Sequence, residues 1–307
     1  MAKILITGGA GFIGSSLAIQ LIKQGHNVAI VDDLSTGKKD YVPREASFYK
    51  LSILSKKLDK VFQKEQPEFV YHLAAQIDVR VSVSNPDLDN SINVLGGLRI
   101  LENCYKYKVK KIIFTSSGGA IYGDASEIPT SETYLPAPVS PYGINKLAFE
   151  KYLRYYFEIF GQKYISLRFA NVYGPRQFKG GEAGVVAIFC HQAVNGQPLT
   201  LNGDGSQTRD FVYIDDIVKA LIVGMDKDYV GELNIGSRRE VSILDVVNSL
   251  KKAVGKDLVI ELRPAAIGEQ QRSFLDVSLV EKVLGWRSEI DLEEGIKRTF
   301  DWSKDNI

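Results

Sequence analysis

The pair of residues with the clearest chemical meaning is a tyrosine and a lysine four positions apart, Tyr142 and Lys146. On a helix, residues i and i+4 project from the same face. A lysine ammonium beside a phenol stabilises the phenolate and lowers the pKa of the tyrosine. Tyr142 could then act as a general base near neutral pH. The spacing alone is not specific, because any helix can carry an aromatic residue beside a solvated lysine.

Three hydroxyl residues, Thr115, Ser116 and Ser117, close an apolar run that is typical of a buried strand. In parallel α/β sheets the carboxyl ends of the strands face the ligand crevice. A hydroxyl there can hydrogen-bond a substrate oxygen or share its proton. Without Tyr142 and Lys146, an ordinary Ser/Gly turn would be the default interpretation of these residues.

A glycine-rich turn near the N-terminus predicts a cofactor site. Gly8, Gly11 and Gly14 have the spacing G-x-x-G-x-x-G between an apolar run and a helical stretch. Gly8 permits the tight turn, Gly11 lets the backbone approach a pyrophosphate, and Gly14 lets the helix pack on the strand. The pyrophosphate would lie at the helix N-terminus, where free N–H groups favour negative charge.

The next apolar run ends at Asp32, whose carboxylate can accept hydrogen bonds from the ribose hydroxyls of adenosine. The same carboxylate would repel a 2′-phosphate, which favours NAD over NADP. Strand, glycine turn, helix and acidic residue follow in the order that a dinucleotide site requires. A glycine turn without a ligand is the less favoured alternative.

The elements that position these residues are predicted to form an α/β fold, a Rossmann-type doubly wound parallel sheet. Several apolar runs are continuous, as expected for strands covered by helices on both faces. Strands are predicted at 3–6, 28–31, 47–51, 69–73, 111–116 and 164–169, and helices after the glycine turn and over 86–107 and 142–160.

The second half of the chain is more mixed and predicts a smaller C-terminal substrate lobe, interleaved with the first domain. A strand at 211–214 with the helix at 217–225 could rejoin the first sheet, and the glycine-rich stretch at 179–181 reads as a mobile loop. We predict an NAD-binding domain over 1–175, rejoined by about 208–226, and a substrate lobe from 176–207 and 227–307. A second substrate should bind between the lobes.

The bulk composition is that of an ordinary soluble globular protein, with 45% hydrophobic and 24% charged residues among 307. A formal net charge of +1 gives no electrostatic argument for nucleic acid or membrane partners. No apolar run is long enough to span a membrane, and the N-terminus leaves no room for a signal peptide. Cys104 and Cys190 are predicted core thiols, the three histidines lack metal-ligand spacing, and His72 reads as a core residue. We expect a cytoplasmic protein.

Together these motifs resemble the extended short-chain dehydrogenase/reductase family, and most closely its NAD-dependent nucleotide-sugar epimerase branch. The family's motifs occur in order along nearly the whole chain, which is more specific than any single motif. The matching segments are 7–14, 72–75, 116–123, 140–146, 168–175, 203–205, 209–212, 234–236 and 284–286.

The resemblance implies that Tyr142 is the catalytic base, Lys146 its partner, and Ser117 the third catalytic residue. It implies NAD contacts at Gly8, Gly11, Phe12, Ile13, Gly14, Asp32, Asp33, Leu34, Ser35, Thr36, Gly37, Ser52, Ile53, Leu73, Ala74, Ala75, Gln76, Asn93, Tyr142, Lys146 and Ala170. It implies a UDP-sugar substrate held by Ser117, Tyr142, Asn171, Arg209, Arg263 and Ser273. Arginine suits the diphosphate because its planar fork binds phosphate oxygens bidentately. No metal ion is expected.

The chain departs from the family pattern at several positions. Aligned without gaps, the catalytic hydroxyl of the family falls on Gly118, one residue after Ser117. An adenine-contacting aspartate of the family is replaced by Ser52-Ile53. The second diphosphate arginine of the family corresponds to Ala266, so Arg263 is the candidate here and Arg272 a substitute.

The resemblance implies a 4-epimerase of UDP-hexoses, which oxidises the sugar to a 4-keto intermediate and returns hydride to the opposite face. Related 4,6-dehydratases place an Asp-Glu pair where this chain has Gly119 and Ala120, so no acid is available there to protonate a leaving hydroxyl. A nucleotide-sugar dehydrogenase, a uronate epimerase and a non-catalytic NAD-binding protein stay open as alternatives.

Two further expectations concern substrate size and assembly. A small residue at Ser273 would leave room for an N-acetylated sugar, whereas a shift of one position would fill that space with Phe274. The resemblance also implies a homodimer that pairs the helices at 86–107 and 142–160. The aromatic residues Tyr152, Tyr155, Tyr156 and Phe157 would add to that contact or pack within the chain.

Overall fold

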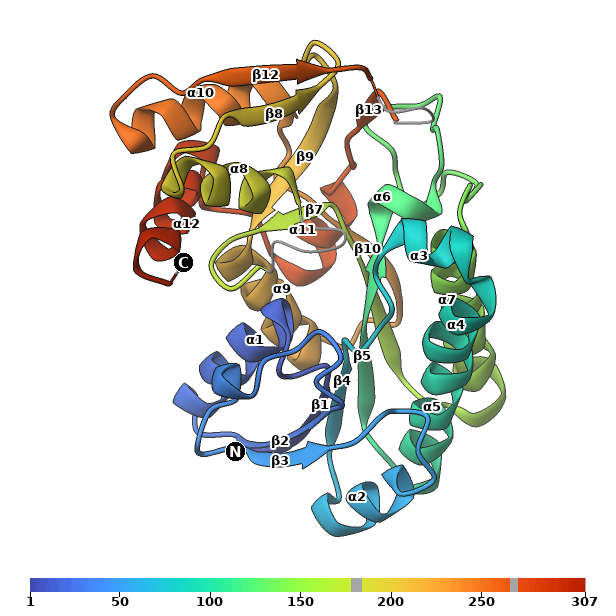
Figure 1. Cartoon of the computed structure of the whole chain (residues 1–307). Coiled ribbons are helices and arrows are strands. Elements are labelled where there is room, and N and C mark those ends of the chain that lie inside the picture. The colour runs from blue at the N-terminus through green and yellow to red at the C-terminus, as the bar shows by residue number, and fades with distance from the viewer. Residues whose placement is uncertain (178–183, 266–269, 307) are drawn as a thin grey trace.

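The centre of the molecule is a seven-stranded parallel sheet with the strand order β10-β6-β5-β4-β1-β2-β3 (Figure 1). The computed structural model describes residues 1–177, 184–265 and 270–306, so the glycine-rich loop predicted at 179–181 lies outside the described residues. The predicted α/β fold class is confirmed. The strands are β1 (Lys3–Thr7), β2 (Asn27–Asp32), β3 (Ser47–Lys50), β4 (Phe69–His72), β5 (Lys111–Ser117), β6 (Tyr164–Phe169) and β10 (Gly231–Ile235).

Helices cover both faces of this sheet because its strands are apolar on both faces. On one face lie α1 (Phe12–Lys23) and α9 (Ile214–Asp226), which contact each other. On the other face lie α5 (Gly97–Lys106) and α7 (Pro141–Phe160), with α2 (Leu58–Glu65) near the sheet edge. Two separate cores result, as expected when successive strand residues point to opposite faces.

The helix that carries the Tyr-Lys pair has well-defined ends. The Ser140 side chain accepts a hydrogen bond from Gly143 N at 3.2 Å, and Pro141 occupies the first turn. Gly161, with a φ of 71°, ends the helix. Tyr142 therefore lies in the first turn of α7, beside the carboxyl edge of the sheet.

The helix predicted over 86–107 forms in three joined pieces: α4 (Pro86–Asn90), the π-helical segment η2 (Ser91–Gly96) and α5. Short π-helical segments inside helices often accompany functional positions. Asn93 lies in this segment and is buried. Three shorter helices complete this half of the molecule: η1 (Lys39–Tyr41), α3 (Val79–Ser84) and α6 (Gly118–Ile121).

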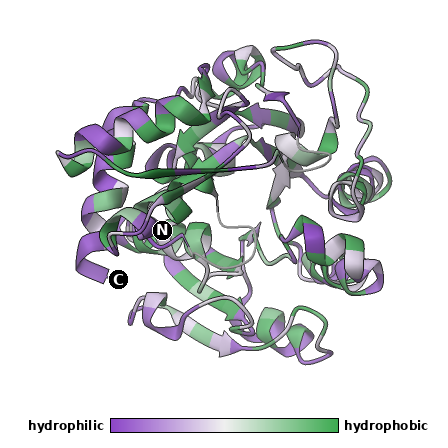
Figure 2. Cartoon of the chain, turned by 45° about the horizontal axis from the view of Figure 1, so that its top comes forward, coloured by the Kyte–Doolittle hydropathy of each residue, from purple (hydrophilic) through white to green (hydrophobic). Residues whose placement is uncertain are grey.

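The described part of the predicted smaller lobe contains two small sheets and four helices. The strands β7 (Asn171–Tyr173), β9 (Thr208–Tyr213), β11 (Glu240–Ser242) and β13 (Arg272–Ser273) form one sheet, and β8 (Leu199–Asn202) pairs with β12 (Ile260–Arg263). The helices are α8 (Val185–Val194), α10 (Ile243–Val254), α11 (Ser278–Leu284) and α12 (Leu292–Asn306). Figure 2 shows hydrophilic and hydrophobic residues interspersed along helices at the outside of the molecule.

One expectation about this lobe is wrong. The strand predicted at 211–214 does not rejoin the first sheet, because it belongs to β9 at the centre of the small sheet. Only the helix that follows it, α9, returns to the main sheet, and the seventh strand is β10. The apolar residues of the segment indicate only that the strand is buried. A strand would be buried in either sheet, so this pattern does not show which sheet it joins. The wider division into two lobes stays a prediction.

Within the described ranges, none of the helices has the length and apolar character needed to cross a lipid bilayer.

Candidate active site

Tyr142 and Lys146 form the predicted pair on one face of α7. The Tyr142 side chain is half-buried, while Lys146 is only 3% exposed beneath it. The Lys146 Nζ atom lies 5.7 Å from the centre of the Tyr142 ring and donates a hydrogen bond to the Thr115 carbonyl at 2.9 Å. A cation in this position stabilises negative charge that develops on the phenol oxygen.

The charge on Lys146 is set by competing neighbours. Burial lowers the pKa of Lys146 to about 8, whereas the carboxylates of Asp89 and Glu150 act to raise it. His72 lies nearby, but burial, with a contribution from Lys146, lowers its pKa to about 3, so its ring is neutral. The His72 ring pairs with the Thr7 hydroxyl at 2.8 Å, which confirms it as a core residue. Lys146 is therefore the cation beside Tyr142.

Ser117 ends β5 and is half-buried, whereas Ser116 before it is buried. At Gly118, where the gap-free alignment places a hydroxyl residue, an added Cβ would lie 2.5 Å from the buried Leu275 side chain. A serine or threonine there would have to displace Leu275. This geometry favours Ser117 as the hydroxyl of the site, and its catalytic role stays a prediction.

The glycine turn is packed as a dinucleotide site requires. Gly8 has a φ of +73°, and an added Cβ would lie 2.7 Å from the backbone nitrogen of Ala74. At Gly14, an added Cβ would lie 2.2 Å from the Gly8 carbonyl oxygen. Only glycine leaves the N-terminus of α1 this close to β1, where helix N–H groups can meet a pyrophosphate. These residues fit NAD.

Asp32 lies at the end of β2, and the residue is 8% exposed. It accepts hydrogen bonds from Ala10 N at 2.9 Å and Leu34 N at 2.8 Å, which fix its orientation. Burial raises the pKa of Asp32, while these two bonds act against that rise. An added Cβ on Gly37 would lie 2.9 Å from the Asp32 carboxylate, so the loop after β2 folds closely around it.

The loop after β4 is joined to the π-helical segment. Gln76 N donates to the Asn93 Oδ1 atom at 3.0 Å, and Asn93 Nδ2 donates to the Gln76 carbonyl at 2.9 Å. Most of the predicted NAD contacts lie in this loop, in the turn after β1 and the first turn of α1, or in the loops after β2, β3 and β6, all at the carboxyl edge of the sheet. The residues in these segments are Gly8, Gly11, Phe12, Ile13, Gly14, Asp33, Leu34, Ser35, Thr36, Gly37, Ser52, Ile53, Leu73, Ala74, Ala75, Gln76 and Ala170.

The small sheet brings three of the predicted substrate residues together. Ser273 of β13 is paired with Arg209 of β9, and Asn171 of β7 is paired with Phe211 of the same strand. Paired residues of neighbouring strands project to the same face, and residues two apart on a strand share that face. Asn171, Arg209 and Ser273 are therefore on one face. Contacts of these residues with substrate stay predictions.

The two other arginines do not join this group. Arg263 lies at the end of β12 with its side chain 62% exposed, 4.0 Å from the Glu261 carboxylate. Arg272 alternates with Ser273 and so projects to the other face, where Nε and Nη2 each donate to Glu240 at 2.7 Å. Of the three arginines, only Arg209 shares a face of the small sheet with Asn171 and Ser273, and its contact with a diphosphate stays a prediction.

Two buried acids of this region escaped the sequence analysis. Glu150 accepts two hydrogen bonds from the Arg168 guanidinium, at 3.1 and 2.7 Å. Asp89 is buried among amide side chains near Lys146. In the sequence, Asp89 stands between the polar residues Asp87 and Asn90. A polar stretch of this kind ordinarily forms the solvent-exposed face of a helix. No signal in the sequence marks it as buried.

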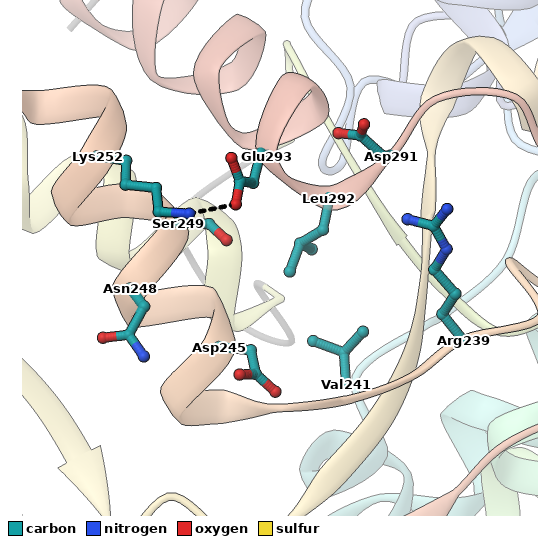
Figure 3. Close-up of a pocket in the computed structure, with 9 residues that line it drawn as sticks. All are labelled: Arg239, Val241, Asp245, Asn248, Ser249, Lys252, Asp291, Leu292 and Glu293. Carbon is teal, nitrogen blue, oxygen red and sulfur yellow. Dashed lines mark hydrogen bonds and ion pairs between the residues drawn. The ribbon is translucent and has the colours of Figure 1, made fainter.

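A separate surface cavity of about 730 Å³ lies between β11, α10 and α12 (Figure 3). Three of its charged residues have polar partners: Lys252 pairs with Glu293, and the Asp245 carboxylate accepts hydrogen bonds from Ser242 at the start of α10. None of the predicted site residues lines it. Within the part of the chain that the structure describes, no cluster of His, Cys, Asp and Glu side chains could hold a metal ion.

A parallel doubly wound sheet, a glycine turn, a buried acid after β2 and a Tyr-Lys pair at the carboxyl edge together define an enzyme of dinucleotide-dependent redox chemistry. The sequence profile of the NAD dependent epimerase/dehydratase family matches residues 4–236. The chain belongs to this family, and its cofactor is NAD.

The chain is similar over its whole length to several nucleotide-sugar epimerases. It is 44% identical to a putative UDP-glucose 4-epimerase from Methanocaldococcus jannaschii, with 99% of each chain covered. The crystal structure of UDP-glucose 4-epimerase from Thermotoga maritima with UDP-glucose has a TM-score of 0.96 and 44% identity, with 98% of each chain covered. The Thermus thermophilus UDP-glucose 4-epimerase complex with NAD has a TM-score of 0.93 and 40% identity, with 99% of each covered.

Proposed function

We propose that the chain is an NAD-dependent 4-epimerase of UDP-hexoses such as UDP-glucose and UDP-galactose. The observation that carries the proposal is the Tyr142–Lys146 pair at the carboxyl edge of the sheet, 5.7 Å from ammonium nitrogen to ring centre. The full-length similarity to UDP-glucose 4-epimerases supports the same substrate class.

The residues of the site act on the sugar 4-hydroxyl. When bound, NAD would accept a hydride from C4 of the sugar and later give it back. Tyr142 takes the hydroxyl proton, because the Lys146 ammonium beneath it stabilises the phenolate. Ser117 hydrogen-bonds the same oxygen. The resulting 4-keto sugar must then turn its other face inward, and Arg209 holds the diphosphate about which it pivots. Tyr142 returns the proton to the oxygen as C4 regains a hydride on its opposite face, and the alcohol is restored with C4 inverted.

Dehydration is disfavoured at this site. Gly119 and Ala120 follow Ser117 and Gly118, so the short helix α6 offers no carboxyl group beside the catalytic hydroxyl. Loss of a hydroxyl needs a proton donor to the leaving oxygen. Oxidation and re-reduction at one carbon need only the Tyr142–Lys146 pair and NAD.

The pairing of Ser273 with Arg209 supports Ser273, not Phe274, as the residue beside the sugar, because Phe274 alternates to the other face. We therefore propose that N-acetylated hexoses are also accepted. A small side chain at this position leaves volume for an acetamido group.

The test is an assay of UDP-glucose, UDP-galactose, UDP-GlcNAc and UDP-GalNAc with the holoenzyme and no added reductant. Epimer interconversion without net NADH absorbance is expected for all four. Accumulating NADH with added NAD would instead identify a dehydrogenase. Tight NAD binding without turnover of any nucleotide sugar, uronic acids included, would identify a non-catalytic protein. Turnover of only the two unacetylated sugars would contradict the role of Ser273.

We also propose a homodimer built on α5 and α7. Apolar side chains on these helices are exposed, and Tyr105, Tyr155, Tyr156 and Phe160 form a cluster of aromatic rings there, with Tyr105 and Phe160 only 4.8 Å apart. Ile159→Glu should shift the mass in light scattering from dimer to monomer. Leu135→Glu, at an exposed apolar residue outside these helices, is the matched control and should leave the dimer intact.

A cytoplasmic location is part of the proposal. Cys104 and Cys190 are free, buried thiols, and burial raises the pKa of Cys190 to about 12. Such thiols are inert core groups, which suits a reducing compartment.

A further inference from the structure

Asp89, in α4, is a carboxylate with no exposed surface. Three amide groups from three other segments donate to it. Gln76 Nε2 and Asn93 Nδ2 donate to Oδ2 at 2.6 and 3.1 Å, and Asn145 Nδ2 donates to Oδ1 at 2.7 Å. No ion pair joins Asp89 to a lysine or arginine of the described ranges. A buried charge without a direct counter-ion is costly and needs a reason.

The cation that Asp89 serves is Lys146, which follows Asn145 on α7. The polar and titratable groups around Lys146 are the Thr115 carbonyl of β5, the neutral His72 of β4, Tyr142 one turn before it, and the two acids Asp89 and Glu150. Glu150 is already neutralised, because Arg168 binds it through two hydrogen bonds. Asp89 is thus the acid whose negative charge is not already paired with an arginine and can stabilise the Lys146 ammonium.

The same carboxylate joins the two sides of the site. Gln76 and Asn93, whose mutual hydrogen bonds hold the loop after β4 to the π-helical segment, are themselves predicted NAD contacts. Asn145 belongs to the catalytic helix. Asp89 therefore fixes α7 against the cofactor loop at the level of the reacting pair. Displacements of about 1 Å at such a site cost large factors in rate.

We propose that Asp89 is a positioning residue for the epimerase reaction: it holds the catalytic helix in register with the NAD-side loop and supplies the negative charge that balances the Lys146 ammonium. The inference rests on the proposed function of the site. Asp89 touches neither substrate nor cofactor in this role and acts through Lys146, Gln76 and Asn93.

The test compares Asp89→Asn with Asp87→Asn in the holoenzyme. Both variants remove one negative charge from α4, but Asp87 is exposed. At position 89 the new amide must point its own N–H groups at one of the three donors. We expect kcat to fall by about 10- to 100-fold, because a displacement of about 1 Å of the catalytic helix costs a factor of this size in rate. KM for UDP-galactose should stay within about threefold, and Asp87→Asn should match wild type.

The pH profile of kcat separates the electrostatic effect of Asp89 on Lys146 from its effect on the packing of α7. Because Asp89 raises the pKa of Lys146, its loss should move the alkaline limb of the kcat profile to lower pH. A profile of Asp89→Asn that overlays those of wild type and Asp87→Asn would overturn the proposal. If wild type itself shows no epimerisation, the proposed function fails and not the positioning role.

An exchange variant guards against simple misfolding. Asp89→Asn combined with Asn145→Asp lets the new amide at 89 donate to the carboxylate at 145, while its oxygen still accepts from Gln76 and Asn93. One negative charge then returns next to Lys146. We expect this variant to recover at least tenfold of the lost kcat and to restore the alkaline limb. A folded, NAD-loaded exchange variant that stays as slow as Asp89→Asn would overturn the proposal.

Discussion

The two walls of the proposed crevice are built differently. On the cofactor side, Asp32, Asn93 and Lys146 are each less than a tenth exposed, and hydrogen bonds fix each of them. On the sugar side, the predicted substrate contacts Asn171, Arg209 and Ser273 are each only half-buried. The chemistry is held rigidly, whereas the groups that would choose the sugar stand on short strands. Reaction type and substrate preference can therefore change independently in this fold.

The largest effect should come from the reacting group of the rigid wall. Tyr142→Phe removes the proton acceptor and should lower kcat by about 10²- to 10⁴-fold, the usual contribution of a general base. KM for UDP-galactose should change little, since the ring remains. The control is Tyr152→Phe on the same helix, whose side chain is exposed and should be silent. If kcat of the Tyr142→Phe enzyme stayed within threefold of wild type, Tyr142 would not be the proton acceptor of the reaction.

The backbone of the rigid wall should be nearly as intolerant. Gly14→Ala places a Cβ 2.2 Å from the Gly8 carbonyl oxygen, a backbone atom that cannot move aside. We expect a loss of about 3 kcal/mol in stability and a protein that retains little NAD, measured by denaturant unfolding and by NAD content after purification. Gly224→Ala, where the nearest atom is 3.5 Å away, is the helical control and should be neutral or mildly stabilising.

The difference between the rigid cofactor side and the sugar side explains which features of the fold and the site could be predicted from the sequence. The six strands of the NAD-binding half, the glycine turn and the Tyr142–Lys146 pair were predictable, because periodic burial and fixed backbone geometry leave a local pattern. The carboxyl edge then follows from the parallel fold. In this half the structure adds long-range contacts, such as those of Asp89, that no local pattern encodes.

The sugar side was less predictable for a physical reason. The strand β10 is a short segment bounded by a glycine with a φ of +136°, and its place beside β6 depends on tertiary pairing. The apolar strand β9 was assigned to the wrong sheet, because burial alone does not specify a partner. The position of Arg263 on β12, away from Arg209, likewise follows from strand pairing that spacing along the chain does not reveal.

The two arginines sharpen the comparison within the sugar side. Arg209→Ala should raise KM for UDP-galactose by about 10- to 100-fold, because a charged hydrogen bond to the diphosphate is worth about 1.5–3 kcal/mol. Arg263→Ala should change KM by less than about threefold, since its side chain is 62% exposed and lies in another sheet. Initial rates over a range of substrate concentrations check both. Equal effects would mean that both arginines reach the diphosphate.

The smallest effect concerns the one buried acid of the small sheet. Asp210 is 1% exposed and accepts from Ser237 N and Oγ, yet burial raises its pKa to about 6. The folded state therefore binds a proton more tightly than the unfolded state, whose carboxyl titrates near 4. Stability from this group is present at low pH and is lost as pH rises through about 6.

Relative to Asp210→Asn, the wild-type protein should therefore lose about 1–3 kcal/mol of unfolding free energy between pH 4 and pH 7, measured by denaturant titration. Asp204→Asn gives the opposite sign, because Ser206 lowers the pKa of the exposed Asp204 carboxyl. For that pair the wild-type advantage should grow as pH rises through the range where the carboxyl ionises. A pH-independent difference for Asp210→Asn would show that burial in the small sheet does not raise the pKa of Asp210, and it would contradict this prediction.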